Sequence, residues 1–359
     1  MKAMSAPASI QLSPVADAPS SSCVPLGEIL YQCKISGGGA SGEGDAGRAS
    51  VSAFFDGYHR FSSVAALLAL PFSAAVLASE AAAPSSSALR AVAARLRAVF
   101  AASGFPPSPF FALLEAKLSQ TVVTFALALP FALTFLLLAK ATVAAMLRDD
   151  DGDHPAARRR KLDALPPCGA VLRAYPALVA THLLNAFLVL SVNAAVFSLL
   201  LLAFGAADLL GAGTWTTAAL SAGGAVAYSL AVGVATVVCN LAVVVAAMER
   251  GRAGHGAVLR ACVLVRGRVS TALAVALPTN LGMAAAEALF QLRVVARRRS
   301  AGGRLEPAVA GEAFSIAYIH AICVVLEIIV SCMFYRSCRR READELRELE
   351  PEEKGEFQA

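Results

Sequence analysis

Charged side chains are scarce in this chain. Only 16% of its 359 residues are charged, while 57% are hydrophobic. A soluble globular chain has about 25% charged and about 45–50% apolar residues. A soluble body of this length needs more polar surface than the sequence supplies, so the composition argues against a soluble enzyme. The mean hydropathy of +0.63 points the same way.

Motifs with a known chemical mechanism are also missing. The sequence has no HExxH, no Walker loop and no GxSxG. Its eight cysteines form no CxxC pair, so neither a zinc ribbon nor a disulfide framework is expected. The basic runs adjoin apolar stretches, where membrane topology accounts for them. We therefore predict no enzymatic activity, no cofactor, no metal site and no nucleic-acid partner.

Long apolar stretches are what the sequence does contain. About 20 apolar residues in a helix cross a hydrocarbon core of roughly 30 Å. Uncharged stretches of this order occur six times, the last interrupted only by Glu327. They predict an all-α, polytopic six-helix transmembrane bundle with disordered polar termini. The expected spans are approximately residues 61–79, 118–146, 176–203, 215–248, 269–292 and 312–335.

Two of these spans leave alternatives open. Residues 209–248 could hold two short spans with a turn at 221–224, although glycines before Trp215 already supply a turn and favour one helix. The fifth span contains Pro278 and Glu287 and could be re-entrant. Proline is tolerated in membrane helices because neighbouring groups satisfy the freed carbonyl.

The basic residues predict an orientation. With six spans, 22 of the 31 basic residues fall on the side of both termini. The positive-inside rule then predicts cytosolic termini, with Arg297–Arg299 as an exception on the opposite side. The sequence leaves the compartment open between an endomembrane and the plasma membrane.

The segments outside the spans are expected to be linkers. Residues 1–60 form a largely disordered cytosolic region with a Gly/Ser-rich linker, and residues 337–359 form a charged cytosolic tail. A short solvated helix or a disordered tail both fit the latter. Residues 89–100 have the spacing of an amphipathic helix on the membrane surface. The basic run 158–161 can attract anionic lipid headgroups, and protein partners or a second copy are further candidates.

Asparagine is rare, and its placement is informative. The chain has four asparagines, and all of them lie in predicted spans: Asn185, Asn193, Asn240 and Asn280. Amides inside a membrane bond across helices, and such bonds contribute about 0.6–2 kcal/mol each. His182 shares one helical stripe with the first two.

Two carboxylates intrude into the spans, namely Glu287 and Glu327. A carboxylate at mid-membrane costs about 2.5–3.5 kcal/mol on insertion scales, so both are expected to face protein or water. His320 lies seven residues before Glu327 on the sixth span. These groups, with His182 and the asparagines, form a candidate polar site that binds a solute or relays protons. The alternative is that they hold the helices together.

Two cysteines adjoin the basic end of the last span. Cys332 and Cys338 precede Arg339–Arg341, which is a setting for S-palmitoylation. Buried cysteines that act as small apolar residues are the alternative.

Three features together resemble a plant-specific family of uncharacterised multi-pass membrane proteins. They are the segment Leu26-Gly-Glu-Ile-Leu30 before the first span, the proline-bearing second span, and the closing segment Val330-Ser-Cys-Met-Phe-Tyr-Arg-Ser-Cys338. The resemblance implies about six transmembrane helices and carries over no catalytic residue and no ligand.

The leading hypothesis is therefore a non-enzymatic membrane protein that acts through partners or lipids, in a scaffold or trafficking role. The alternative is a transporter or channel subunit that uses the His/Glu/Asn interior.

Overall fold

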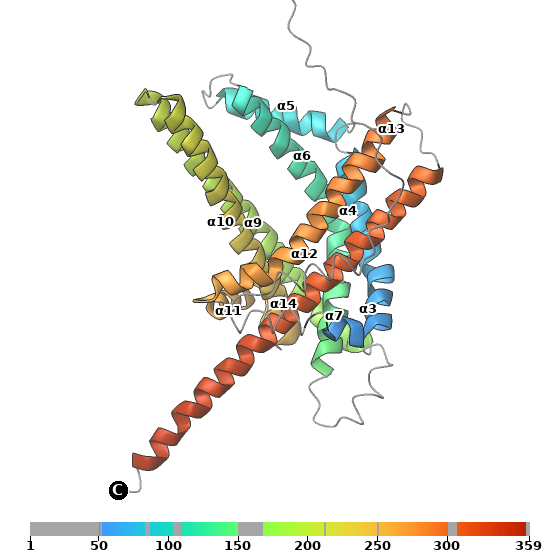
Figure 1. Cartoon of the computed structure of the whole chain (residues 1–359), viewed down its shortest axis with the longest axis vertical. Coiled ribbons are helices and arrows are strands. Elements are labelled where there is room, and N and C mark those ends of the chain that lie inside the picture. The colour runs from blue at the N-terminus through green and yellow to red at the C-terminus, as the bar shows by residue number, and fades with distance from the viewer. Residues whose placement is uncertain are drawn as a thin grey trace, which may run out of the picture. The chain divides into compact units, whose positions relative to one another are not determined.

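The computed structural model describes residue 50 and residues 52–82, 87–102, 109–149, 168–211, 213–249, 251–300 and 307–356. These ranges are helical and contain no strand, so the predicted all-α fold is confirmed (Figure 1). Most of the N-terminal region and the basic run 158–161 lie outside the described residues. Helical structure already occurs at 52–56, before the predicted boundary at residue 60.

Six helical segments are long and apolar enough to cross a membrane, as predicted. They are Tyr58–Ser79, Val122–Arg148, Val171–Ala207, Ala218–Met248, Val269–Arg298 and Pro307–Glu345. The fourth is part of one helix, α10 (Thr214–Met248), with no turn at 221–224. The fifth is also continuous: α12 (Val269–Phe290), the π-helical η4 (Gln291–Val295) and α13 (Ala296–Ser300) follow one another without a re-entrant turn.

The first two spans each contain a π-helical segment near a proline. The first span consists of α3 (Tyr58–Val64), η1 (Ala65–Ala69) and α4 (Leu70–Ala82). The second consists of α6 (Pro109–Phe131), η3 (Ala132–Leu136) and α7 (Leu137–Asp149). Pro130 has no N–H, so the carbonyl four residues before it lacks its usual helical donor. The Thr134 hydroxyl donates to the carbonyl of Pro130 itself at 2.8 Å.

Two shorter helices lie between spans. α5 (Ser87–Ala102) covers the segment predicted to be an amphipathic helix. α11 (His255–Val265) follows α10 and packs against it and against α9 (Cys168–Leu209). Gly254 and Gly267 flank α11 with φ of +57° and +79°, a left-handed conformation that glycine adopts without steric cost.

The last helix is the centre of the packing. α14 (Pro307–Glu356) contacts the helices of the first, second, fourth and fifth spans. Half of its most apolar window is buried, whereas none of the corresponding window of α9 is. α9 packs mainly along α10. The six spans therefore divide into a set gathered on α14 and a pair in which α9 relies on α10.

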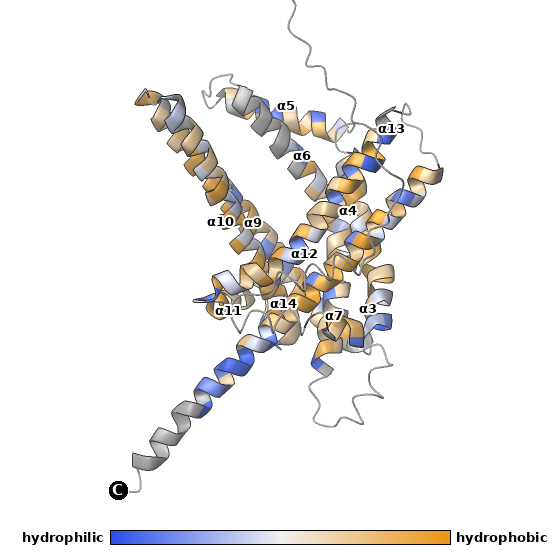
Figure 2. Ribbon diagram, in the orientation of Figure 1, coloured by the Kyte–Doolittle hydropathy of each residue, from blue (hydrophilic) through white to orange (hydrophobic). Residues whose placement is uncertain are grey.

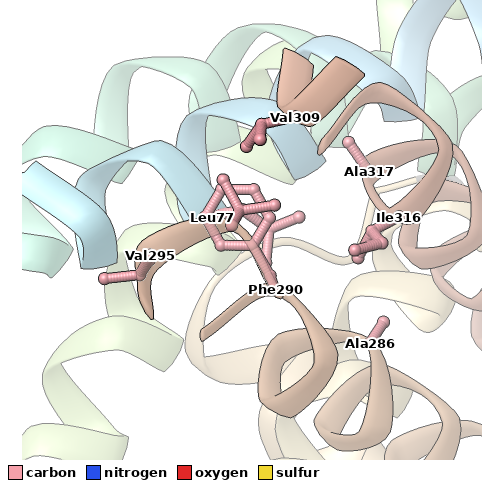
Figure 3. Close-up of a cluster of buried hydrophobic side chains, with 8 residues drawn as sticks. Leu77, Ala286, Phe290, Val295, Val309, Ile316 and Ala317 are labelled. Atoms are coloured by element: carbon pink, nitrogen blue, oxygen red, sulfur yellow. The ribbon is translucent and has the colours of Figure 1, made fainter. Parts of the chain in front are cut away.

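An apolar cluster joins α4, α12, η4 and α14 (Figure 3). Leu77 lies against the ring of Phe290, and Ile316 and Ala317 of α14 complete this side of the core. Between membrane-spanning helices such contacts contribute through van der Waals packing. The cluster fixes α12 against α14 one turn from Glu287 and His320.

The tail is helical. α14 continues without a break to Glu356, which answers the choice between a short helix and a disordered tail. Figure 2 shows its colour changing from apolar orange to polar blue beyond the packed part.

Candidate functional site

Three helices meet at a buried lysine. The Nζ of Lys140 on α7 donates to the Oδ1 of Asn240 on α10 at 3.0 Å. The Nδ2 of Asn240 in turn donates to the Oε1 of Glu327 on α14. Lys140 is only 7% exposed. One amide thus lies between a cation and a carboxylate, and we call these three residues the lysine site.

The topology explains why these residues meet. They lie on the second, fourth and sixth spans, which run in the same direction through a membrane. Each precedes a polar residue at the C-terminal end of its span by eight or nine positions: Arg148, Glu249 and Tyr335. At 1.5 Å per residue this is about 12 Å, so the three side chains share one depth.

The surroundings of the lysine site are apolar on one side and hollow on the other. A buried apolar cluster flanks Lys140 and Asn240, and it contains Leu137, Ala141 and Val243. A cavity of about 20 Å³ is lined by Asn240, Glu327, Ser331 and apolar groups of α10, α12 and α14. This volume holds about one water molecule. Asn240 therefore links Lys140 to Glu327, with room for water beside the carboxyl group.

A second polar group joins α4, α12 and α14. His320 is 3% exposed, and its Nδ1 lies 2.9 Å from the hydroxyl of Ser73, which is fully buried. Its Nε2 lies 3.6 Å from Glu287 Oε1. We call these three residues the histidine site. Its order of groups is that of a serine hydrolase triad, but no substrate can reach a serine that is fully buried.

The other predicted polar residues serve different roles. Asn185 donates to the Cys239 carbonyl at 2.7 Å, and Asn193 accepts from the Tyr228 hydroxyl at 2.7 Å, so both join α9 to α10. Asn280 donates to a carbonyl of its own helix. His182 joins neither site by a hydrogen bond among the described residues, although it lies within electrostatic range of Lys140.

A third group of charges lies at the C-terminal ends of α10 and the packed part of α14. Glu249 accepts from the Tyr335 hydroxyl at 2.7 Å and lies 3.6 Å from Arg260 of α11. Arg260 also donates to Glu342. This hydrogen bond raises the pKa of the Arg260 guanidinium above its ordinary value. We call these four residues the end cluster.

Each of these groups includes a residue of α14. Five of the polar residues of α14 lie at successive intervals of eight, seven, eight and seven, each about two helical turns: Glu312, His320, Glu327, Tyr335 and Glu342. Each has a partner on another helix; Glu312, for example, pairs with Arg297 of α13 at 3.1 Å. We call this series the polar ladder.

Each π-helical segment lies one turn from a member of the two sites. η1 ends four residues before Ser73, η3 ends four before Lys140, and η4 begins four after Glu287. Short π segments are rare and are frequent at functional sites.

The sequence interpretation found His320, Glu287, Glu327 and Asn240 but missed Lys140 and Ser73. The uncharged run ends at Ala139, which placed Lys140 at the margin of the second span. A signal was present, because the next charged residue is Arg148, two turns further along the helix. Ser73 carries no comparable signal, since serines are common in this chain.

The two candidate lipidation sites are buried free thiols. Cys332 is 0% and Cys338 is 3% exposed, and the Cys338 sulfur lies 3.9 Å from the Leu264 carbonyl. An acyl chain on either sulfur requires the side chain to leave this position. Their lipidation stays a prediction.

Comparison with known proteins assigns a family. The chain belongs to the family described as a domain of unknown function (DUF8558), whose model matches residues 48–349. That range contains all six candidate spans and the whole polar ladder. No curated protein and no solved structure matches the chain.

Proposed function

We propose that this member of the DUF8558 family is a multi-pass membrane transporter whose central site is Lys140, Asn240 and Glu327. The observation that carries the proposal is a lysine buried between three spans and joined to a carboxyl group by an amide. Ionisable groups inside a membrane are costly and are concentrated on ion and substrate pathways.

A purely structural role accounts less well for this arrangement. Neutral bonds already join α9 to α10 at Asn185 and Asn193. Replacing a buried ion pair by apolar residues is often neutral or stabilising, so packing alone gives no reason to retain charge. The water-sized cavity beside Glu327 and the π segment next to Lys140 also support a site that changes its contacts.

The test uses the purified full chain in proteoliposomes on a solid-supported membrane. A pH jump and concentration jumps of potassium, sodium, chloride, phosphate, malate and glutamate are applied in turn. We expect at least one jump to produce a current that Glu327→Gln lowers at least tenfold, compared at equal amounts of protein that elutes as a folded species in detergent. Tyr228→Phe, which removes a neutral intramembrane bond, is the matched control and keeps the current. The absence of current for every jump contradicts the proposal.

A second candidate is the partner-binding role in a scaffold or trafficking complex. The observation that favours it is the helical extension of α14 beyond its packed part, where the sequence has eight acidic residues between 342 and 356. Truncation after residue 342 should then change the proteins found by proximity labelling in cells while leaving the liposome current intact. Unchanged neighbours count against this role.

We also propose cytosolic termini, from the distribution of basic residues, in an endomembrane or the plasma membrane. The test starts from a variant that lacks its own cysteines and carries one new cysteine, at residue 300 in one chain and at residue 345 in another. A membrane-impermeant maleimide should label these two cysteines from opposite sides of the membrane. The restriction of the family to plants and the lack of enzymatic activity stay predictions.

A further inference from the structure

We infer that the polar ladder of α14 carries protons between the two membrane faces, with the histidine and lysine sites as its two acceptors inside the membrane. This inference rests on the proposed transport function and names its ion. It begins from the regularity of the ladder, in which a polar group recurs at every second turn from Glu312 to Glu342.

The chemistry of the two sites favours a proton over a metal cation. Each site has a single carboxylate, and no cluster of three or more metal-ligating side chains occurs among the residues that the structure describes. A hard cation needs six or more oxygen ligands. The ammonium of Lys140 also repels a cation that approaches Glu327, whereas a carboxylate and an imidazole each accept one proton.

The lysine site has a cavity beside its carboxylate. Val330, Ser331 and Phe334 of α14 line this cavity together with Glu327. A water molecule there can exchange a proton with the Glu327 carboxylate. The charged and titratable groups that face Glu327 from neighbouring positions are Lys140 and His320.

The histidine site contains one side chain that is not enclosed by protein. The Glu287 side chain is 38% exposed, whereas His320 is buried. The groups that face the imidazole are Ser73, Glu287 and, two turns along, Glu327. We assign the entry of protons into this site to Glu287, because it is the more exposed of the two titratable groups.

A narrow apolar segment separates the two sites. They lie seven residues apart on α14, about 10 Å along its axis. Val324 between them is 2% exposed, and a Cβ at Gly282 of α12 would lie 3.1 Å from the Cys323 sulfur, so α12 and α14 approach closely here. The two acceptors thus face different sides of a closed segment, which is the arrangement of a carrier and not of an open pore.

The proton moves between the two sites in three steps. Glu287 passes a proton to His320, giving an imidazolium and a carboxylate. The imidazolium then gives this proton to Glu327 through water that enters the segment, leaving a neutral imidazole and a carboxylic acid. Glu327 releases the proton to the cavity water and becomes a carboxylate again. Lys140 keeps its protons throughout and neutralises the ionised form of Glu327.

The experiment measures proton uptake into proteoliposomes loaded with the pH-sensitive dye pyranine. A potassium gradient with valinomycin makes the interior negative. We expect the full chain to acidify the vesicles at least tenfold faster than protein-free vesicles do. Glu327→Gln and Glu287→Gln should each reduce the rate at least tenfold, Glu327→Asp should retain part of it, and Tyr228→Phe should retain all of it.

The outcomes separate this inference from the proposed function. If solute jumps give a current that depends on Glu327 while proton uptake equals that of empty vesicles, the proton path is wrong and the transporter proposal stands. If both signals are absent, both are wrong. Should Glu327→Gln fail to fold, Glu287→Gln decides, because its side chain is partly exposed and tolerates the change. An unchanged proton rate in that variant overturns the path.

Discussion

The α9/α10 pair and the helices gathered on α14 place polar groups in the membrane in different ways. Between α9 and α10, neutral amides bond to a carbonyl and to a phenol. Along α14, a carboxylate, an imidazole and an ammonium are involved. Both arrangements satisfy hydrogen bonds, but only the second contains groups that gain or lose a proton. The comparison fits the proposal that the ionisable groups serve transport while the neutral bonds hold the helices together.

The largest expected effect concerns the charge of Lys140. Lys140→Met leaves Glu327 buried without its cation, which costs about 3–5 kcal/mol of unfolding free energy. Adding Glu327→Gln to the same chain should restore most of this loss, because no uncompensated charge remains. Denaturant unfolding in detergent micelles measures both variants. Equal losses in the single and the double variant would show that the two charges are not coupled.

The next largest loss of unfolding free energy is expected at two asparagines, Asn240 and Asn185. Asn240→Leu removes two hydrogen bonds to charged groups, each worth about 1.5–3 kcal/mol, and should lower the unfolding free energy by about 3 kcal/mol. Asn185→Leu removes one bond to a carbonyl and should cost about 1 kcal/mol. The same unfolding experiment ranks them. The reverse order would mean that the α9/α10 pair, and not α14, dominates stability.

A smaller effect is expected for Tyr228. Tyr228→Phe removes one hydroxyl from a neutral pair and should cost about 0.6 kcal/mol, the average for such bonds in membranes. Thermal unfolding and the proteoliposome current are read on the same sample. A lost current with intact stability would give the α9/α10 pair a functional role that its chemistry does not suggest.

The smallest effect belongs to the end cluster. Glu342→Gln breaks a pair with Arg260 in which the two side chains are 23% and 37% exposed. Solvent screening limits the contribution of such a pair to the unfolding free energy to less than about 1 kcal/mol. The difference from the parent chain should disappear near 1 M salt, where the Debye length is about 3 Å. A loss that persists at high salt would indicate packing instead of charge.

Much of the fold can be predicted from the sequence, because burying charge in hydrocarbon is costly and the membrane-spanning segments are therefore nearly free of charged residues. All six spans and the location of Glu327 and Asn240 are visible in this way. The partners are not, because a hydrogen bond between Asn240 and Lys140 joins residues 100 positions apart. Likewise, Ser73 has no pattern of its own and becomes notable only when His320 packs against it.

The π segment η3 lies one turn before Lys140 and has a consequence for how that lysine can move. A π segment contains one residue more than the equivalent stretch of α-helix, and this surplus can pass along a helix without breaking it. If it passes Lys140, the residue turns by about 100° around the helix axis, the angle of one α-helical residue. The ammonium would then swing away from Asn240 and Glu327 while both ends of the span keep their places. Such a shift of η3 would separate Lys140 from Asn240 and Glu327 by rotation alone.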